Sequence, residues 1–376
     1  MDNTDRRAWA YLSRICEPPN SFLAELVGAE GPVAAAQRIR ARQVDGELAR
    51  VTEARHHIDS SHADLEVLDR LGGRLITPSD DEWPHLAFAS FGRPALAKRP
   101  YGHPPLVLWA VGPSNLTDVA ARSAALVGTR AASPYGEHVT AEFAAGLAER
   151  DVTVVSGGAY GIDGAAHRTT LACDGDTVAV LAAGIDVPYP SGHSALLHRI
   201  ARSGLVLTEY PPGMRPTRRQ FLARNRLVAA LSGATVVMEA GVRSGAANTA
   251  AWATALGRQV CALPGPVTSA SSAGCHIMIA NGTARLVTRA ADVVEAVGRV
   301  GELAPEPDRP TTELDGLDDT ELTVYDAIPR RGARTVAEIA IRAGLPVADV
   351  LGPLAMLDLR GLVRQGEDGW KLAKRS

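Results

Sequence analysis

The pattern of apolar residues changes character along the 376-residue chain. Residues 7–15 and 22–27 carry apolar side chains at helical spacing, and helical spacing resumes after a Gly/Pro break near residue 31. We therefore expect residues 1–70 to form a small helical cap of the SAM or helix-hairpin-helix type.

The pattern beyond the cap predicts a parallel sheet. Between residues 124 and 297, short apolar runs alternate with amphipathic segments, which is typical of βαβ units covered on both faces. Short β-rich runs between residues 74 and 109 lead into this region, so we place one Rossmann-like, DNA-binding domain at residues 71–298. Six strands are expected, at residues 124–128, 152–157, 177–184, 204–209, 234–239 and 259–265.

The last part of the chain predicts a second, smaller domain. Prolines mixed with charged residues indicate a linker over residues 299–315, and residues 316–376 read as three helices and a hairpin, the order of a winged helix. The third helix contains Asp349, Asp358 and Arg360, so a DNA-reading helix and a protein-contact module both stay open. The predicted fold class is α/β, an extended Rossmann-like parallel sheet core with an N-terminal helical domain and a C-terminal winged-helix domain.

Composition narrows the cellular setting and the kinds of partner. The formal net charge is −3, so any nucleic-acid site must be a local patch on a nearly neutral body. The N-terminus lacks an apolar leader, and no run of about 18 apolar residues indicates a membrane span. We therefore expect a cytoplasmic protein without a membrane partner. Its four cysteines, Cys16, Cys173, Cys261 and Cys275, are expected to be reduced, because no CxxC pair occurs among them.

Four loops are the candidate binding elements. Ligands of open parallel sheets bind at the carboxyl ends of the strands, where backbone N–H groups and helix N-termini face outward. The segments that follow expected strands in this way are residues 127–136, 156–167, 209–226 and 239–250, and all four should open on one edge of the sheet.

The second of these loops is rich in glycine. Gly157, Gly158, Gly161 and Gly164 would let backbone N–H groups surround a phosphate, and tight packing of a strand-to-helix turn is the less favoured alternative. A dinucleotide fold would place GxGxxG after the first strand, where Gly128 stands alone, and GxxxxGK[ST] is absent from the sequence. The sequence therefore argues against both an NAD site and a P-loop.

The third loop is strongly basic. Residues 210–238 contain five arginines and no acidic residue, which indicates an anionic ligand unless the loop is simply solvated. Phe221 lies within this run and would be either a platform for a nucleobase or a core anchor. The arginines are Arg215, Arg218, Arg219, Arg224 and Arg226.

The order of the motifs resembles the DNA-processing protein A family, also called DprA or Smf. The matching segments are VGTRAASPYG, VVSGGAYGIDGAAH, AGIDVPYPSGH, EYPPG, FLARNRLVAALS, VVMEAGVRSGAANTA, ALPGPV and AGCHIMIANGTA, which together cover about 160 residues. The resemblance implies a single-stranded DNA-binding protein that forms a homodimer through the Rossmann-like domains. It also implies protection of incoming DNA and loading of the recombinase RecA in natural transformation and recombination.

The resemblance also assigns roles to individual residues. Arg130, Arg218 and Arg224 would hold phosphates, Asn225 and Ser244 would add hydrogen bonds, and Ile277 and Ile279 would lie at the dimer face. Tyr160 stands where the family usually has an arginine, which removes a cation and leaves an aromatic surface. The complete expected binding set is Thr129, Arg130, Ser133, Gly157, Gly158, Tyr160, Arg218, Phe221, Arg224, Asn225, Arg226 and Ser244.

An enzyme is the competing hypothesis. Asp163, Glu209 and Glu239 lie near strand ends, where related nucleoside-monophosphate hydrolases carry acidic residues, but the PGGxGT signature of those enzymes is absent. Asp163 is instead expected to cap the helix that follows it. We expect neither catalysis nor a cofactor or metal, and we expect the histidines at 56, 57 and 62 to be solvated; a pure adaptor protein is the other alternative.

Overall fold

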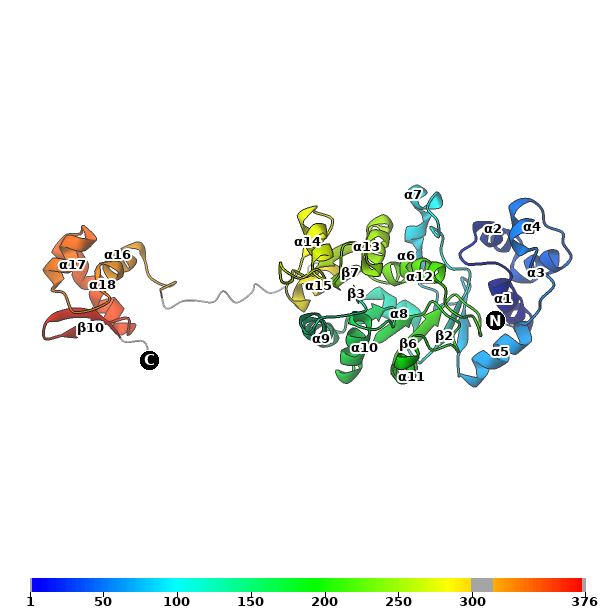
Figure 1. Cartoon of the computed structure of the whole chain (residues 1–376), viewed down its shortest axis with the longest axis horizontal. Helices are drawn as coiled ribbons and strands as arrows, with labels where there is room; N and C mark the ends of the chain where they lie inside the picture. Colours follow the sequence, from blue (N-terminus) through cyan, green and yellow to red (C-terminus); the bar gives the residue numbers. More distant parts are fainter. Residues whose placement is uncertain (1, 299–313, 374–376) are drawn as a thin grey trace. The chain divides into compact units, whose positions relative to one another are not determined.

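The computed structural model describes residues 2–298 and 314–373. The chain divides into two compact units, residues 1–305 and 306–376, and each is described by itself (Figure 1). The linker predicted at residues 299–315 lies outside the described residues, apart from its last two positions.

One nine-stranded sheet organises the larger unit, in the order β1-β2-β6-β5-β4-β3-β7-β8-β9. The pairs from β6 to β9 are parallel, and β1 and β2 add an antiparallel edge. The six predicted strands are confirmed as β3 to β8. The bounds are β1 Arg74–Ile76, β2 Leu108–Val111, β3 Ser123–Gly128, β4 Thr153–Ser156, β5 Thr177–Val180, β6 Leu205–Thr208, β7 Ala234–Glu239, β8 Gln259–Ala262 and β9 Arg285–Leu286.

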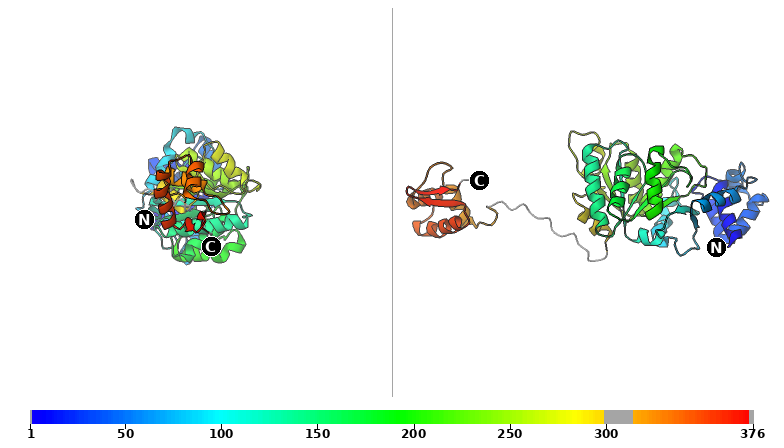
Figure 2. Two further views of the ribbon diagram at one scale, coloured as in Figure 1. Left: turned by 90° about the vertical axis from the view of Figure 1, so that its left-hand side faces the viewer. Right: turned by 90° about the horizontal axis from the view of Figure 1, so that it is seen from below.

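Helices cover both faces of the sheet, as the continuous apolar strands require. In β3, Ala125 and Val127 face a core shared with α12 and α13, whereas Ala124 and Leu126 face a core shared with α9, α10 and α15. Figure 2 shows the second layer from below, where α9, α10 and α11 run side by side. These helices are α9 Pro134–Ala148, α10 Ile162–Ala172, α11 Ser194–Ser203, α12 Arg218–Ala230, α13 Gly245–Leu256, α14 Ala273–Ala280 and α15 Ala290–Val297.

The helical cap shares a core with the sheet. Leu12 and Ile15 of α1 lie in one apolar cluster with Trp109 of β2 and Val206 of β6, so the cap and the sheet form one unit. Arg14 donates hydrogen bonds to Asp64 and to the carbonyl oxygen of Pro212, which fastens the cap to the loop after β6. The cap helices are α1 Asn3–Ile15, α2 Ser21–Glu30, α3 Pro32–Arg40, α4 Gly46–Thr52 and α5 Ser61–Arg70.

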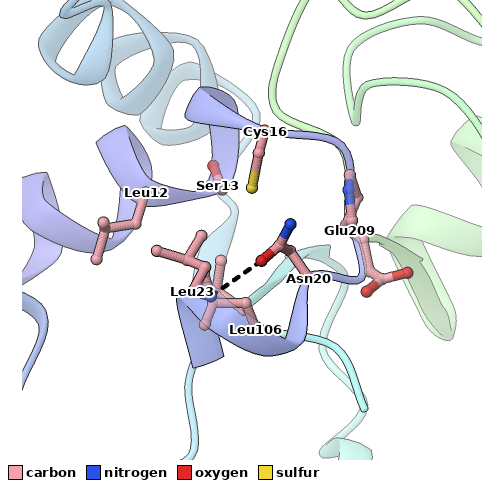
Figure 3. A pocket seen from close by; sticks show the side chains of 9 residues that line it. Leu12, Ser13, Cys16, Asn20, Leu23, Leu106 and Glu209 are labelled. Carbon is pink, nitrogen blue, oxygen red and sulfur yellow. Dashed lines mark hydrogen bonds between the residues drawn. The ribbon is translucent and has the colours of Figure 1, made fainter. Parts of the chain in front are cut away.

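A small cavity of about 20 Å³ remains between the cap and the end of β6 (Figure 3). Leu12, Cys16 and Leu106 line it, together with Glu209. Burial raises the pKa of the Cys16 thiol to about 12, so this thiol is protonated at neutral pH. The cavity has room for about one water molecule and none for a substrate.

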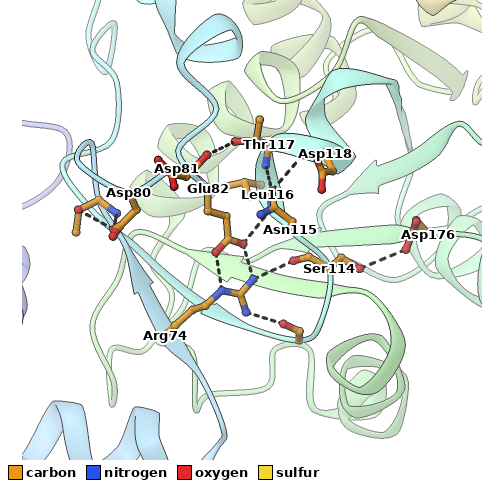
Figure 4. Close-up of polar contacts among 12 residues, drawn as sticks. Arg74, Asp80, Asp81, Glu82, Ser114, Asn115, Leu116, Thr117, Asp118 and Asp176 are labelled. Atoms are coloured by element: carbon orange, nitrogen blue, oxygen red, sulfur yellow. Dashed lines mark hydrogen bonds and ion pairs between the residues drawn. The ribbon is translucent and has the colours of Figure 1, made fainter. Parts of the chain in front are cut away.

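A partly buried ion pair lies at the edge of the sheet, beside β1 (Figure 4). Arg74 of β1 pairs with Glu82 and donates to the carbonyl oxygens of Gly112 and Ser114, and Glu82 accepts from the backbone N–H of Leu116. These contacts join β1 to the segment that leads into β3. The short helices of this region are α6 His85–Ala89, η1 Ser90–Gly92, α7 Pro94–Ala97 and α8 Leu116–Ala121, and η2 Ser191–His193 precedes α11.

The smaller unit has the helix, helix, helix and hairpin order that the sequence predicts. Its core includes Leu354 and Trp370, while Leu351 and Leu359 of the third helix are exposed. In the described chain no single helix is long and apolar enough to cross a membrane, although α17 and α18, bent by 105°, meet the length and composition criteria as a pair. The bounds are α16 Asp319–Ala327, α17 Val336–Ala343, α18 Val347–Leu359, β10 Val363–Gly366 and β11 Gly369–Leu372.

Candidate nucleic-acid interface

The candidate site lies where the strand order reverses. β3 has β4, the next strand in sequence, on one side and β7 on the other, and open α/β sheets bind ligands at the carboxyl ends of strands at such a point. A cavity of about 740 Å³ opens there. It is lined by Val127, Gly128, Thr129, Arg130, Gly157, Ala159, Asp163, Tyr189, Pro216, Arg218, Phe221, Leu222, Arg224, Asn225, Val228, Arg243, Ser244, Gly245, Ala246 and Thr249.

An arginine and an aromatic ring face each other across this cavity. The Cζ atom of Arg130, from the loop after β3, lies 5.0 Å from the centre of the Phe221 ring on α12. The ring of Tyr189 also contacts Phe221, with the ring centres 5.4 Å apart and the ring planes tilted by 53°. Phe221 is only partly buried and lines the cavity, so the structure favours the platform over the core anchor.

The cavity is cationic. Arg130, Arg218, Arg224 and Arg243 line it, against the single carboxylate of Asp163. Arg130, Arg218 and Arg243 are exposed, and among the described residues none of the three has a carboxylate within ion-pair distance. Guanidinium groups without counter-charges create a positive potential that attracts phosphate.

Arg224 differs from the other three because it is only 5% exposed. Its guanidinium donates 2.7 Å to the carbonyl oxygen of Gly157 and also donates to that of Val180, at the ends of β4 and β5. Burial lowers the pKa of Arg224 and raises the pKa of Asp163, and each charge opposes the shift of the other. Arg224 therefore forms part of the cavity floor and supports the surrounding loops.

The glycine loop is built for close packing. A Cβ at Gly157 would lie 2.5 Å from the Arg224 guanidinium, and one at Gly161, which has φ +71°, would lie 2.3 Å from the carbonyl oxygen of Thr129. The backbone N–H groups of Gly157 and Ala159 donate to Asp163 at 3.1 and 3.3 Å. A carboxylate of the protein itself thus occupies the predicted phosphate nest, and Gly158 does not line the cavity.

Asp163 does not cap its helix, contrary to the prediction. Gly161 is the N-cap residue of α10 and Asp163 lies inside the first turn, from which its side chain reaches back to the preceding loop. The helix begins two residues earlier than the motif implied, after Gly161, whose φ of +71° is a backbone conformation that glycine adopts readily.

Arg226 lies outside the cavity, although the sequence placed it in the binding set. It has no exposed surface and forms a buried ion pair with Glu209, and it also donates 3.0 Å to the carbonyl oxygen of His103. Two helical positions correspond to a rotation of about 200°, so Arg224 and Arg226 leave α12 in nearly opposite directions. The basic run over residues 210–238 begins one residue after Glu209, so this counter-charge at the end of β6 was not paired with Arg226.

Two polar residues of the expected set lie at the cavity wall. Ser244 caps α13, accepting from the backbone N–H of Ala247 at 3.2 Å. The side-chain amide of Asn225 donates to Asn248 at 3.2 Å. The structure thus brings together Thr129, Arg130, Gly157, Arg218, Phe221, Arg224, Asn225 and Ser244.

Ser133, Gly158, Tyr160 and Arg226 do not line the cavity. Ser133 caps α9, and its hydroxyl donates to Glu239 at 2.7 Å. Burial raises the pKa of Glu239, but hydrogen bonds from Ser271 and Ser133 outweigh it and hold that pKa below its usual value. Glu239 therefore joins the loop after β3 to the segment that precedes α14.

Among the cavity residues that sequence reasoning missed are its fourth arginine, Arg243, and its second aromatic residue, Tyr189. The signal for Arg243 was available, because the loop after β7 contains one arginine at the same edge of the sheet. Tyr189 comes from the loop after β5, which carries no charge cluster, so only the topology brings it to this edge.

The predicted dimer-face residues lie on α14. Ile277 is 44% exposed, and Ile279 is partly buried against the main core. The structure contains one chain, so this interface stays a prediction. The described residues hold no group of three or more His, Cys, Asp or Glu side chains arranged to bind a metal.

Comparisons with known proteins give consistent matches. The model of the DNA recombination-mediator protein A family matches residues 74–298, and the model of the DprA winged-helix domain matches residues 305–369. A putative DNA processing protein DprA of Mycobacterium tuberculosis is 62% identical over 374 residues, 100% of this chain and 96% of that protein. The protein Smf of Escherichia coli is 36% identical over 257 residues, 67% of this chain and 68% of that protein.

Two solved structures share the arrangement. The X-ray structure of DprA from Streptococcus pneumoniae has a TM-score of 0.63 and 30% identity, covering 79% of this chain and 99% of that chain. A structure of DprA from Helicobacter pylori, described for its single-stranded DNA binding mode, has a TM-score of 0.51 and 28% identity, covering 59% of this chain and 94% of that chain.

Proposed function

Because the chain belongs to the DNA recombination-mediator protein A (DprA) family, we propose that it binds single-stranded DNA in the cavity at the carboxyl ends of β3, β4 and β7. The observation that carries the proposal is the pairing of an unneutralised guanidinium with a partly exposed ring, Arg130 and Phe221, at 5.0 Å. Single-strand binders combine base stacking on aromatic residues with cationic contacts to phosphate, and both are present here.

Binding is proposed to be sequence-independent and selective for unpaired strands. Arginine contacts to phosphate and ring contacts to a base face carry little sequence information. A base can reach Phe221 only after it leaves a duplex stack, and a paired base cannot enter. The Helicobacter pylori relative, whose structure concerns single-stranded DNA, supports the same ligand for this chain.

The proposed contact set follows the geometry. Arg130, Arg218 and Arg243 face phosphates, Phe221 stacks on a base, and Arg224 contributes charge from the cavity floor. The full set is Thr129, Arg130, Gly157, Arg218, Phe221, Arg224, Asn225, Arg243 and Ser244. Ser133, Gly158 and Arg226 are assigned structural roles instead.

Further roles rest on the family relationship. We propose that the bound strand is protected and then transferred to RecA in transformation and recombination, and that the chain acts as a homodimer. The match to several DNA processing proteins DprA supports these roles. No step of this proposal involves bond cleavage by the protein.

The three acidic candidates for an enzyme are occupied by protein partners. Asp163 accepts from two backbone N–H groups, Glu209 is paired with Arg226, and Glu239 accepts from Ser133 and Ser271. A carboxylate held in this way is a poor general base, so the geometry supports binding over hydrolysis.

A mobility-shift titration with a thymidine oligomer, with and without excess duplex, tests the proposal. We expect a shift that duplex DNA does not compete away. Release of ribose from nucleoside monophosphates would instead indicate the hydrolase. If the protein neither shifts an oligomer nor releases ribose, the adaptor role is the hypothesis that remains.

A further inference from the structure

A second aromatic and cationic pair lies outside the cavity. Tyr160, from the loop after β4, is 46% exposed, and its ring stands edge-on to that of His193 with a centre separation of 4.7 Å. Tyr189, 42% exposed, lines the cavity and contacts Phe221, and it stands three residues before Gly192, which contacts Tyr160. The loop after β5 therefore contacts both the aromatic ring of the cavity, through Tyr189, and the exposed ring outside it, through Gly192.

The Tyr160 ring is held in place. Its hydroxyl oxygen accepts a hydrogen bond of 3.2 Å from the backbone N–H of Gly192, and a Cβ at Gly192 would lie 2.5 Å from that oxygen. His193 beneath the ring is buried, and its Nδ1–H donates 3.0 Å to the carbonyl oxygen of Gly158. An exposed ring that is fixed at both ends loses little conformational entropy when a ligand stacks on it.

A cation lies near His193, the residue that contacts the Tyr160 ring. A Cβ at Gly164 would lie 3.0 Å from the guanidinium of Arg168 and 2.5 Å from the imidazole of His193, so the two side chains are neighbours. Arg168 is exposed, and the described chain places no carboxylate within ion-pair distance of it. The group is thus available for a phosphate on the His193 side of Tyr160.

The spacing of the two platforms suits one continuous strand. Tyr189 and Gly192 are three residues apart, so their Cα atoms are at most about 11 Å apart. Gly192 contacts Tyr160 and Tyr189 contacts Phe221, so the platforms are separated by a few nucleotides at most. Sequence-tolerant binders use successive stacking platforms of this kind beside a cationic path.

We propose that Tyr160 and Arg168 form a second binding step for the strand that leaves the cavity over Tyr189. The inference rests on the proposed binding of single-stranded DNA. It adds the direction in which the strand leaves the cavity and the length of strand that the protein covers. A short oligomer should fill only the cavity, whereas a longer one should reach both platforms and bind more tightly.

Fluorescence anisotropy with thymidine oligomers of about 5 and about 15 nucleotides tests this step on the full-length protein. Tyr160→Ala should lower affinity for the longer oligomer by about tenfold and leave the shorter one unchanged. Tyr160→Phe should bind both as the wild type does, since the ring is retained. Arg130→Ala should weaken both lengths, and Phe22→Ala, an exposed ring on the cap, should weaken neither.

The outcomes separate the two claims. A wild type that binds neither oligomer contradicts the proposed function itself. A wild type that binds both lengths equally, or a Tyr160→Ala variant that weakens both lengths equally or neither, overturns the second step alone. Photo-crosslinking of 5-iodouridine, placed at successive positions of the longer oligomer, should label the peptide with Tyr160 from an outer position, and labelling confined to Phe221 would contradict the path.

Discussion

The guanidinium of Arg130 lies over the ring of Phe221 at 5.0 Å, although the two residues are 91 positions apart in the sequence. This contact links the loop after β3 to the helix after β6 across the carboxyl edge of the sheet. It also holds the guanidinium within the cavity, because a cation over a ring face gains about 0.5–1 kcal/mol at an exposed site.

Replacing Arg130 by alanine should weaken single-strand binding for all sequences. A lost phosphate contact removes about 0.7 from the slope of log affinity against log salt. The measurement is a set of binding isotherms between low and physiological salt. Arg50→Ala, on an exposed part of the cap, is the matched control and should keep the wild-type slope. An unchanged slope in Arg130→Ala would remove this residue from the contact set.

Replacing Phe221 by alanine should lower the affinity for single-stranded DNA without changing its dependence on salt. The lost stacking should lower affinity by about 1–3 kcal/mol at every salt concentration, so the slope stays as in the wild type. Phe221→Tyr keeps the ring and should restore most of the affinity. A Phe221→Ala variant with wild-type affinity would show that no base stacks there.

The large parallel sheet was predictable because each strand from β3 to β8 carries its own apolar run, whereas β9, two exposed residues, carries none. The convergence of the loops was predictable too, since parallel strands share one carboxyl edge. The fate of individual arginines was not: Arg224, Arg226 and Arg218 occur in one basic run, but helix rotation sends two of them into buried contacts and leaves one exposed. Buried partners such as Glu209 at the end of β6 decide such cases, and the spacing of the arginines does not reveal them.

The Arg226–Glu209 pair predicts a stability effect without a binding effect. Arg226→Ala leaves the Glu209 carboxylate buried and unpaired, which costs about 3–5 kcal/mol of unfolding free energy. Urea unfolding should show this loss, while the folded variant binds an oligomer as the wild type does. The double variant Arg226→Met with Glu209→Gln should recover part of the stability. If the folded Arg226→Ala variant bound the oligomer more weakly than the wild type, Arg226 would belong to the DNA contact set after all.

The proposed dimer face can be tested at Ile277. Its side chain is 44% exposed, so Ile277→Glu should fold normally yet place a charge in the interface. Light scattering should then report one chain of 39.5 kDa where the wild type gives two. Leu86→Glu, at a 91% exposed position on α6, is the control and should remain dimeric. An unchanged mass in Ile277→Glu would exclude α14 from the interface.

His167 predicts how the stability of the larger unit depends on pH. The Thr177 hydroxyl donates to the carbonyl oxygen of Val154, so it accepts from Nδ1–H of His167 at 2.7 Å, and Nε2 is buried without a partner. Burial, followed by the charges of His193, Arg224 and Arg168, lowers the pKa of His167 from 6.5 to about 3. The folded protein therefore keeps this ring neutral across the acidic range.

Above pH 6.5 the ring is neutral in both states and contributes no pH dependence. Between pH 6.5 and about 3 only the unfolded chain takes up the proton, so unfolding becomes easier by about 1.4 kcal/mol for each pH unit lost. His167→Asn keeps a donor for Thr177 and should remove that contribution to the slope, even though the smaller side chain lowers stability at pH 7.

Urea unfolding by tryptophan fluorescence measures the difference in a Trp370→Phe background, where the other four tryptophans all report on residues 1–305. His138→Asn, at an exposed histidine of α9, should keep the wild-type slope. Equal slopes for His167→Asn and the wild type between pH 6 and 4 would mean that the ring is protonated, or exposed, in the folded state. Because Arg224 and His193 both lie near His167, the same result would also show that the charges beneath the cavity are arranged differently from the contacts described above.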